Sequence, residues 1–430
     1  MTTPSTADHR KKHISPTVWY LFAALTACAG AWWWVFSLFT PLQSGRYWSG
    51  AVFAWVHLAI LGGLLTGAFG VMFQLVPIAF QAPPVPRRMA LWHLPLHLLS
   101  VTLMIIGFLR MEFGLVGIGG SVLLVCSLLF LFTIYKSYRQ ARNKTVVHQR
   151  FWIPVAGLLL VMSIGVWQAL GLPGTGAPLL FSHIVMGSLW FWGGLILVIS
   201  YKFIPMFVLS HGYYANLKLS SALYFFGTAL TAVSSYWPFA NAPLPSLLGS
   251  VFVIGGIATM LQDVQRIVKA RKRKRIVFPL KIAIAATLTL SFSMVLLLAA
   301  IDFHSLPLGI DAGYLFLFAG MVPLLAGYAQ KMVPFLYYEY RYSHAPDRKS
   351  APLIDEMVPR VPVRLATILY TGSVITGLVY FLTDLKISPS IRLIINLILS
   401  FSGATAFVFL LASFISVLRI GGKRPDDTSE

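Results

Sequence analysis

Two histidines within long apolar stretches are the side chains of this sequence best placed to bind a cofactor. His57 lies in AWVHLAILGG, and His183 lies in FSHIVMGSLWFW. Each lies about 5–7 residues, or roughly 8–10 Å, inside its apolar stretch at 1.5 Å per helical residue. Neutral imidazole is a common ligand of metals and heme iron, and polar side chains at membrane depth are usually functional. His57 and His183 are therefore candidate ligands of a heme or a metal, with hydrogen bonding between helices as the alternative.

The remaining histidines are weaker candidates. His304 lies in IDFHSLPLGID, where Asp302 or Asp311 can orient the imidazole for ligation, and an ordinary polar loop is the alternative. His93 and His97 share a helix face because they are four residues apart. That spacing can hold a metal, but their place near a helix start favours packing at the membrane interface. We expect solvated interfacial positions for the other histidines, which are His9, His13, His148, His211 and His344.

The rest of the polar side chains argue against several kinds of chemistry. Cys28 and Cys126 lie far apart in apolar stretches, so the sequence has no CxxC-type metal or redox motif. It also contains no Walker loop, no Rossmann glycine pattern and no HExxH sequence. We expect none of the 13 acidic residues at mid-membrane, which argues against proton pumping and carboxylate-based cation coupling.

The composition predicts that these side chains lie on membrane-spanning helices. Hydrophobic residues make up 57% of the 430 residues and charged residues only 11%, whereas soluble domains contain about 25% charged residues. A soluble enzyme, a disordered chain and a disulfide scaffold are therefore excluded. At about 20 residues per spanning helix, the chain has room for about twelve spans. Twelve apolar segments are visible, at roughly 17–40, 50–80, 89–109, 113–135, 151–171, 179–209, 219–237, 244–264, 278–300, 310–337, 362–384 and 391–418.

The placement of lysine and arginine predicts the orientation of these spans. With a cytoplasmic N-terminus, 29 of the 33 basic residues fall on the cytoplasmic side, and the 4 outside are Arg46, Arg110, Lys386 and Arg392. This asymmetry follows the positive-inside rule and predicts that residues 1–16 and 419–430 are cytoplasmic tails. The basic run at 270–275 is then expected to face anionic lipid. We expect the lipid bilayer to be its partner and do not expect it to bind nucleic acid.

Three short strings indicate an internal repeat. They are FQLVP at 73–77, YKFIP at 201–205 and QKMVP at 330–334, separated by 128 and 129 residues. Each follows a glycine-rich apolar stretch and is expected to end a helix at its proline, and the glycines allow close helix packing. The sequence therefore predicts an all-α integral membrane protein with twelve transmembrane helices in three four-helix repeats. The single membrane domain, 1–430, divides into units at roughly 17–135, 151–264 and 278–418, with Pro77, Pro205 and Pro334 as equivalent anchors.

This arrangement resembles subunit I of the heme-copper oxidases. The resemblance rests on the twelve helices in three four-helix arcs and on His57 in the outer half of the second helix. It implies a heme-binding protein of the bacterial inner membrane, with His57 as an axial heme ligand and His183 and His304 as further cofactor ligands. It also implies electron transfer or oxygen or nitric-oxide chemistry, and a cytochrome or another respiratory-complex subunit as partner.

The sequence departs from the oxidase pattern at the copper site. It has no adjacent pair of histidines, and the span expected at 310–337 contains no histidine. Within the predicted spans, only His57 and His183 lie where the resemblance implies a metal ligand. An oxidase-type copper site is therefore expected to be incomplete or absent, and oxygen reduction is expected to be absent or to depend on a partner. The alternative function is a non-catalytic transporter, or an assembly or structural subunit, on the same scaffold.

Overall fold

The computed structural model describes residues 14–420, except 40–41, 43–46, 80, 142–143, 237–243, 273–274, 343–351 and 383–387. The described residues form helices and connecting loops. Among these residues, Ser210 and Arg271 form an isolated antiparallel β-bridge. Most of the two predicted tails lies outside the described residues. The same is true of His9, His13, His344, Arg46 and Lys386, and of part of the basic run at 270–275.

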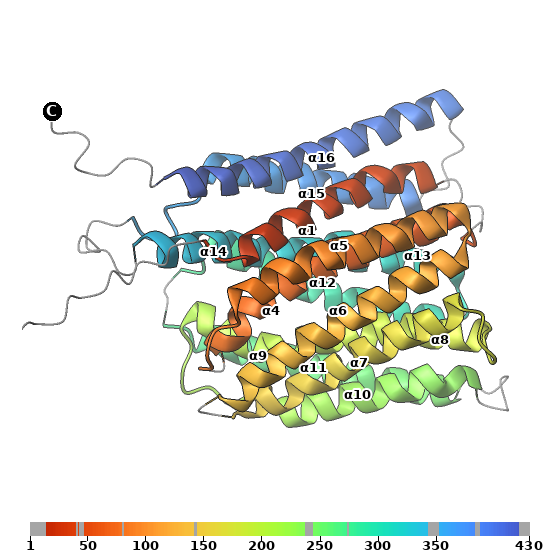
Figure 1. Ribbon diagram of the computed structural model, residues 1–430, viewed down its shortest axis with the longest axis horizontal. Coiled ribbons are helices and arrows are strands. Elements are labelled where there is room, and N and C mark those ends of the chain that lie inside the picture. The colour runs from red at the N-terminus through yellow and green to blue at the C-terminus, as the bar shows by residue number, and fades with distance from the viewer. Residues whose placement is uncertain are drawn as a thin grey trace, which may run out of the picture.

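The helices form twelve rods, here called spans 1 to 12, as the sequence predicted (Figure 1). Spans 1–4 are α1 with η1 (Thr17–Val35, Phe36–Leu38), α3–η2–α4 (Gly50–His57, Leu58–Leu65, Thr66–Ala79), α5 (Arg87–Arg110) and α6 (Phe113–Arg139). Spans 5–8 are α7 (Val146–Ala169), α8–η3–α9 (Ala177–Val185, Met186–Gly193, Gly194–Val208), α10 with η4 (Leu217–Val233, Ser234–Tyr236) and α11 (Leu244–Lys269). Spans 9–12 are α12 (Phe278–Asp302), α13–η5–α14 (Leu306–Tyr314, Leu315–Met321, Val322–Arg341), α15 (Arg360–Leu382) and α16 (Pro389–Arg419).

The chain is an integral membrane protein. Eleven of the described helices are long and apolar enough to cross a membrane. Span 7 is the exception, because its sequence is rich in serine and threonine. These hydroxyls turn back onto the helix or onto neighbouring helices, as when Ser220 donates to the carbonyl of Gly256 (2.9 Å). Span 7 therefore keeps its polar groups satisfied without water.

The spans pack as a closed ring of three similar units. Consecutive spans contact one another throughout, and span 12 (α16) contacts span 1 (α1). Within every unit the second span also contacts the fourth, through the pairs α4 with α6, α9 with α11 and α14 with α16. The second spans end in α4, α9 and α14, and these C-terminal parts lie toward the same end of the bundle (Figure 1). The loops that follow the even-numbered spans also lie at this end, which we call the basic end. We call the opposite end of the bundle the far end.

Each second span is interrupted by a π-helical segment, in which the backbone hydrogen bond joins residues five apart. The π-segments η2, η3 and η5 begin at Leu58, Met186 and Leu315. These starts are 128 and 129 residues apart, which are the steps that separate the three anchor prolines. Each anchor proline thus lies 19 residues after the start of its π-segment. The predicted three four-helix repeats are confirmed.

The anchor prolines do not all end their helices. Pro77 and Pro205 lie in the last turn of α4 and α9, as predicted, but α14 continues past Pro334 to Arg341. The prediction was wrong for Pro334 because a proline removes one backbone hydrogen bond, which a well-packed membrane helix tolerates. Pro334 is buried in this packing.

One carbonyl in each π-segment accepts a hydrogen bond from a side chain of the following span. The acceptors occupy equivalent repeat positions and are Leu61, Leu189 and Phe318. The donors lie on α5, α10 and α15 and are His97 (3.1 Å), Tyr224 (2.8 Å) and Tyr370 (2.8 Å). A π-turn breaks the α-helical ladder, so a neighbouring side chain satisfies the carbonyl that the break exposes.

Removal of one of these donors is expected to destabilise the bundle. Tyr370→Phe leaves the Phe318 carbonyl without its 2.8 Å donor, which should lower the free energy of unfolding by about 1–2 kcal/mol. Thermal unfolding of the purified protein in detergent measures the loss. Tyr236→Phe is the matched control because Tyr236 is exposed, and it should leave the unfolding temperature unchanged. Equal melting of both variants and the parent protein would contradict the expectation.

Spans 7 and 8 (α10 and α11) pack through glycines. A Cβ atom at Gly227 would lie 2.5 Å from the carbonyl oxygen of Gly249 and 2.6 Å from the backbone nitrogen of Val253. A Cβ atom at Gly256 would lie 2.8 Å from the carbonyl oxygen of Ser220. The two backbones approach so closely that only hydrogen fits between them, as in other small-residue membrane interfaces.

A buried acid ties the basic end of the second unit together. Asp263 in α11 is fully buried. It accepts hydrogen bonds from the hydroxyl of Tyr201 (2.9 Å), the backbone N–H of Asn216 (2.7 Å) and the guanidinium of Arg266 (3.0 Å). The predicted span ended at residue 264, whereas α11 continues to Lys269, so Asp263 lies inside the helix.

Candidate functional site

All histidines within the described helices lie on spans 2, 3, 5 and 6. They are His57 in α3, His93 and His97 in α5, His148 in α7 and His183 in α8. The spans that carry them are neighbours in the ring, since α3 contacts α5 and α7 contacts α8. The imidazoles that can bind a cofactor are therefore concentrated in one sector of the ring.

His57 is held in one tautomer at the far half of span 2. It is the last residue of α3, immediately before the π-segment η2. Its Nδ1 lies 2.7 Å from the carbonyl oxygen of Phe53. A carbonyl only accepts, so Nδ1 carries the proton and donates it, and Nε2 carries the lone pair. The half-buried ring packs against Phe108, with ring centres 4.5 Å apart.

His183 has the same arrangement on span 6. Its Nδ1 donates to the carbonyl oxygen of Val161 in α7 (3.0 Å), which leaves Nε2 as the atom with the lone pair. The half-buried ring lies against Gly165, where a Cβ atom would be 3.0 Å from Cε1 of the histidine. His57 and His183 thus both lie on spans of the sector that carries the helical histidines.

His304 lies elsewhere and in a different setting. It is exposed in the loop between α12 and α13, with φ of 50°, and its backbone N–H donates to the carbonyl of Ile301 (3.2 Å). Asp302 accepts a hydrogen bond from Ser246 (2.5 Å), and no hydrogen bond joins it to His304 within the part of the chain that the structure describes. Asp302, one of the two acids that were candidates to orient His304, therefore serves another partner.

The position of span 10 equivalent to His57 is occupied by Tyr314, the residue before η5. Tyr314 is buried, and its hydroxyl donates to the carbonyl of Val374 (3.1 Å). Its ring lies 5.4 Å from that of Phe318, centre to centre. Span 10 thus has packing and a helix-to-helix hydrogen bond at the repeat position that His57 occupies in span 2.

His93 and His97 are buried, so the prediction that they pack at the membrane interface was wrong. Their exposed fractions are 3% and 0%. Span 3 turns this face toward α1, α4 and α6, and both rings make edge-to-face contacts with Phe69 at 4.9 and 5.4 Å. The prediction of interfacial packing was wrong because the position of a residue along a helix does not determine the direction in which its side chain faces. The solvated position expected for His148 was also wrong, since His148 is 1% exposed.

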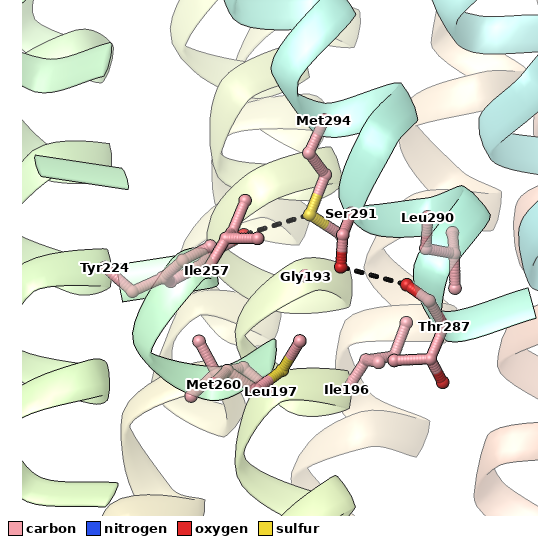
Figure 2. A pocket seen from close by; sticks show the side chains of 10 residues that line it. All are labelled: Gly193, Ile196, Leu197, Tyr224, Ile257, Met260, Thr287, Leu290, Ser291 and Met294. Carbon is pink, nitrogen blue, oxygen red and sulfur yellow. Dashed lines mark hydrogen bonds between the residues drawn. The ribbon is translucent and has the colours of Figure 1, made fainter. Parts of the chain in front are cut away.

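The interiors of the second and third units are filled by side chains, including side chains from a neighbouring unit. Figure 2 shows the space beside Gly193, where the hydroxyl of Tyr224 contacts Met294 Sδ (3.6 Å). The volume of this cavity is about 10 Å³, which is roughly the room that one water molecule needs. Trp32 of span 1 enters the third unit, where it packs edge-to-face on Phe318 and donates from Nε1 to the carbonyl of Leu399 (3.1 Å). The sector of spans 2–6 is therefore the candidate site.

The donor atoms of this sector fit axial ligation of a heme iron. A ligating imidazole normally donates its other N–H to a carbonyl or carboxylate, and both His57 and His183 meet this requirement. An oxidase-type copper centre fits less well, because α10 carries no histidine and the described residues hold no group of three or more His, Cys, Asp or Glu side chains that could bind one metal ion. A scan against protein-family models finds no match to this chain, and a search of curated protein sequences finds no relative.

Proposed function

We propose that this protein binds heme in the far half of spans 2–6 and carries electrons in the membrane, in the manner of an oxidase subunit I-like protein. The observation that supports the proposal is the shared tautomer of His57 and His183. Both imidazoles donate through Nδ1 to a backbone carbonyl, and so both present Nε2 as a ligand atom. His57 is the primary axial ligand of the proposal, and His183 is the second.

The roles of the residues follow from their contacts. A bound heme iron would supply one-electron redox chemistry. The Phe53 carbonyl holds the His57 ring in place, and Phe108 covers its face, while Val161 and Gly165 seat His183. A cytochrome or another respiratory subunit is the proposed electron partner. Oxygen or nitric-oxide reduction at an oxidase-type copper is left out of the proposal, since spans 6 and 7 together carry only one histidine.

The proposed setting is a bacterial inner membrane with both termini in the cytoplasm. The support is the distribution of charge, because 29 of the 33 lysines and arginines belong to segments on the same side as the N-terminus. Such segments stay on the cytoplasmic side during insertion. Cysteine labelling of the loop at 171–176 and of the loop at 209–216 tests the orientation, since a membrane-impermeant reagent should reach only the first from outside intact cells.

A pyridine-hemochrome assay and a visible spectrum of the protein from heme-supplied cells test the function. We expect a Soret band with a defined heme-to-chain ratio. His57→Ala should remove most of the heme or convert a low-spin to a high-spin spectrum, because iron loses its first axial imidazole. His211→Ala is the control, since His211 is exposed in the loop after α9. Folded protein without a Soret band, or a spectrum that neither His57→Ala nor His183→Ala alters, would overturn the proposal.

One observation favours a second function, which is transport of an apolar solute. A crevice with a volume of about 60 Å³ lies between α4, α7 and α9, and its lining is apolar except for Lys202. Its members include Met72, Phe151 and Phe203. Solute uptake by proteoliposomes that persists in His57→Ala and fails when Met72 is replaced by Trp would favour this function over heme binding.

A further inference from the structure

We propose that the crevice between α4, α7 and α9 binds an anionic phospholipid, with the lipid phosphate on Lys202 and one acyl chain along the apolar walls. The crevice lies where the first and second units meet. Along spans 2 and 6 it lies nearer the basic end than His57 and His183 do. The inference goes beyond the proposed heme function and does not depend on it. It names a resident lipid, rather than a transported solute, as the occupant of the crevice.

Lys202 differs from its repeat equivalents because it has no partner. The equivalent residues, 128 positions before it and 129 positions after it, are Gln74 and Lys331. Gln74 accepts a hydrogen bond from Ser15 (2.9 Å), and Lys331 pairs with Asp355. Lys202 is half-buried, and among the described residues it has neither a hydrogen bond nor an ion pair. A half-buried ammonium group without a partner favours an anion from outside the chain.

The surroundings of Lys202 offer no acid that could neutralise it. The sequence from residue 9 to residue 262 contains a single acid, Glu112, which begins span 4 at the far end. The next acid, Asp263, is enclosed by its own three partners. The electrostatic neighbour of Lys202 is His148, which is neutral or positive. Lys144 acts on the same histidine, so a second ammonium group belongs to this corner of the basic end.

The walls of the crevice suit an acyl chain. They are apolar except for Lys202 and run from residue 68 to 76 along α4 and from 195 to 203 along α9. Eight helical steps measure about 12 Å, so the crevice is elongated in the direction in which these helices cross the membrane. Its volume of about 60 Å³ has room for roughly four to six groups the size of a water molecule or a methylene. Lys202 lies near the basic end of this length, where its ammonium group can reach the headgroup level.

Native mass spectrometry of the full-length protein in detergent tests the site. The protein is titrated with phosphatidylglycerol and, separately, with phosphatidylcholine that carries the same acyl chains. We expect one phosphatidylglycerol per chain to bind about five-fold more tightly than phosphatidylcholine, because a basic side chain near an anionic headgroup contributes about 1 kcal/mol.

Two variants separate the headgroup contact from the acyl-chain contact. Lys202→Gln introduces the residue of the equivalent position in the first unit, Gln74, and should remove the preference for phosphatidylglycerol. Lys218→Gln is the matched control, because Lys218 is exposed at the basic end, and it should keep the preference. Ala68→Phe places a ring in the crevice that Ala68 lines, and it should weaken the binding of both lipids.

All three variants should elute as folded, monodisperse protein. Equal affinity of the parent protein for the two lipids would overturn the site, and so would a preference that survives Lys202→Gln or is lost equally in Lys218→Gln. Inorganic phosphate serves as a further competitor. Displacement of phosphatidylglycerol by phosphate, together with full lipid affinity in folded Ala68→Phe, would show a simple anion site and overturn the lipid.

Discussion

Asp263→Ala is expected to lower the free energy of unfolding by about 3–5 kcal/mol, the loss that follows removal of one partner from a buried ionic network. The Asp263 carboxylate receives the hydroxyl of Tyr201, the backbone N–H of Asn216 and the guanidinium of Arg266. Alanine leaves the first two donors buried or half-buried without an acceptor. The connection between α9 and α10 would lose one of its polar contacts with α11 and keep the one from Ser210 to the carbonyl of Ile267.

Thermal or denaturant unfolding in detergent, together with the yield of monodisperse protein, measures this effect. Asp263→Asn keeps one acceptor oxygen and should give a smaller loss than Asp263→Ala. Asp355→Ala is the matched control, because the Asp355 side chain that pairs with Lys331 is 36% exposed, and a pair with an exposed partner should contribute about 1 kcal/mol or less. A loss at Asp263 no larger than the loss at Asp355 would show that the network does not hold the basic end together.

Gly227→Leu is expected to prevent the correct docking of spans 7 and 8. Even the Cβ atom of alanine would meet the carbonyl of Gly249 at 2.5 Å and the nitrogen of Val253 at 2.6 Å. These are backbone atoms, so relief requires the two helices to separate. Overpacking of a close-packed core costs about 1–3 kcal/mol for small insertions, and we expect Gly227→Ala to lose about that much and Gly227→Leu to give little folded protein.

Gly372→Ala is the control for the glycine effect. Gly372 also lies in a helix, α15, but a Cβ atom there would have no atom within 4 Å. Alanine should therefore be neutral or stabilising by about 0.5–1 kcal/mol, because it restricts the unfolded chain and favours the helix. Unfolding midpoints of the two alanine variants make the comparison. Similar midpoints for Gly227→Ala and Gly372→Ala would refute close backbone contact as the cause.

The spans and the repeat could be predicted because they depend on the order of residues along the chain. Apolar length gave all twelve spans to within a few residues of the observed bounds, and the spacing of Pro77, Pro205 and Pro334 revealed three units. These signals are local, or they repeat at a fixed interval. Bilayer thickness and the need to satisfy the backbone inside the membrane leave few alternatives to a helix.

The direction in which side chains face could not be predicted in the same way. His93 and His97 appeared interfacial because they follow Arg87 closely, yet they are buried against Phe69. Asp263 appeared to lie at a helix end, yet it is enclosed by residues from α9 and from the start of span 7. These outcomes depend on which neighbours a helix face meets, and that is decided by tertiary packing. The histidines of the described helices all fall on spans 2, 3, 5 and 6, and this distribution is the signal in the sequence that could have indicated this sector.

The three π-segments also explain why a helical wheel misreads the second spans. A π-bulge contains one residue more than the α-helical turn it replaces, and each α-helical residue turns the chain by about 100°. The apolar stripe that begins before Leu58, Met186 or Leu315 is therefore rotated out of phase with the stripe that follows it. Deleting a single residue within one π-segment would bring the two stripes into phase. The helix that follows the π-segment would then face the wrong neighbours, and that unit would differ from the other two.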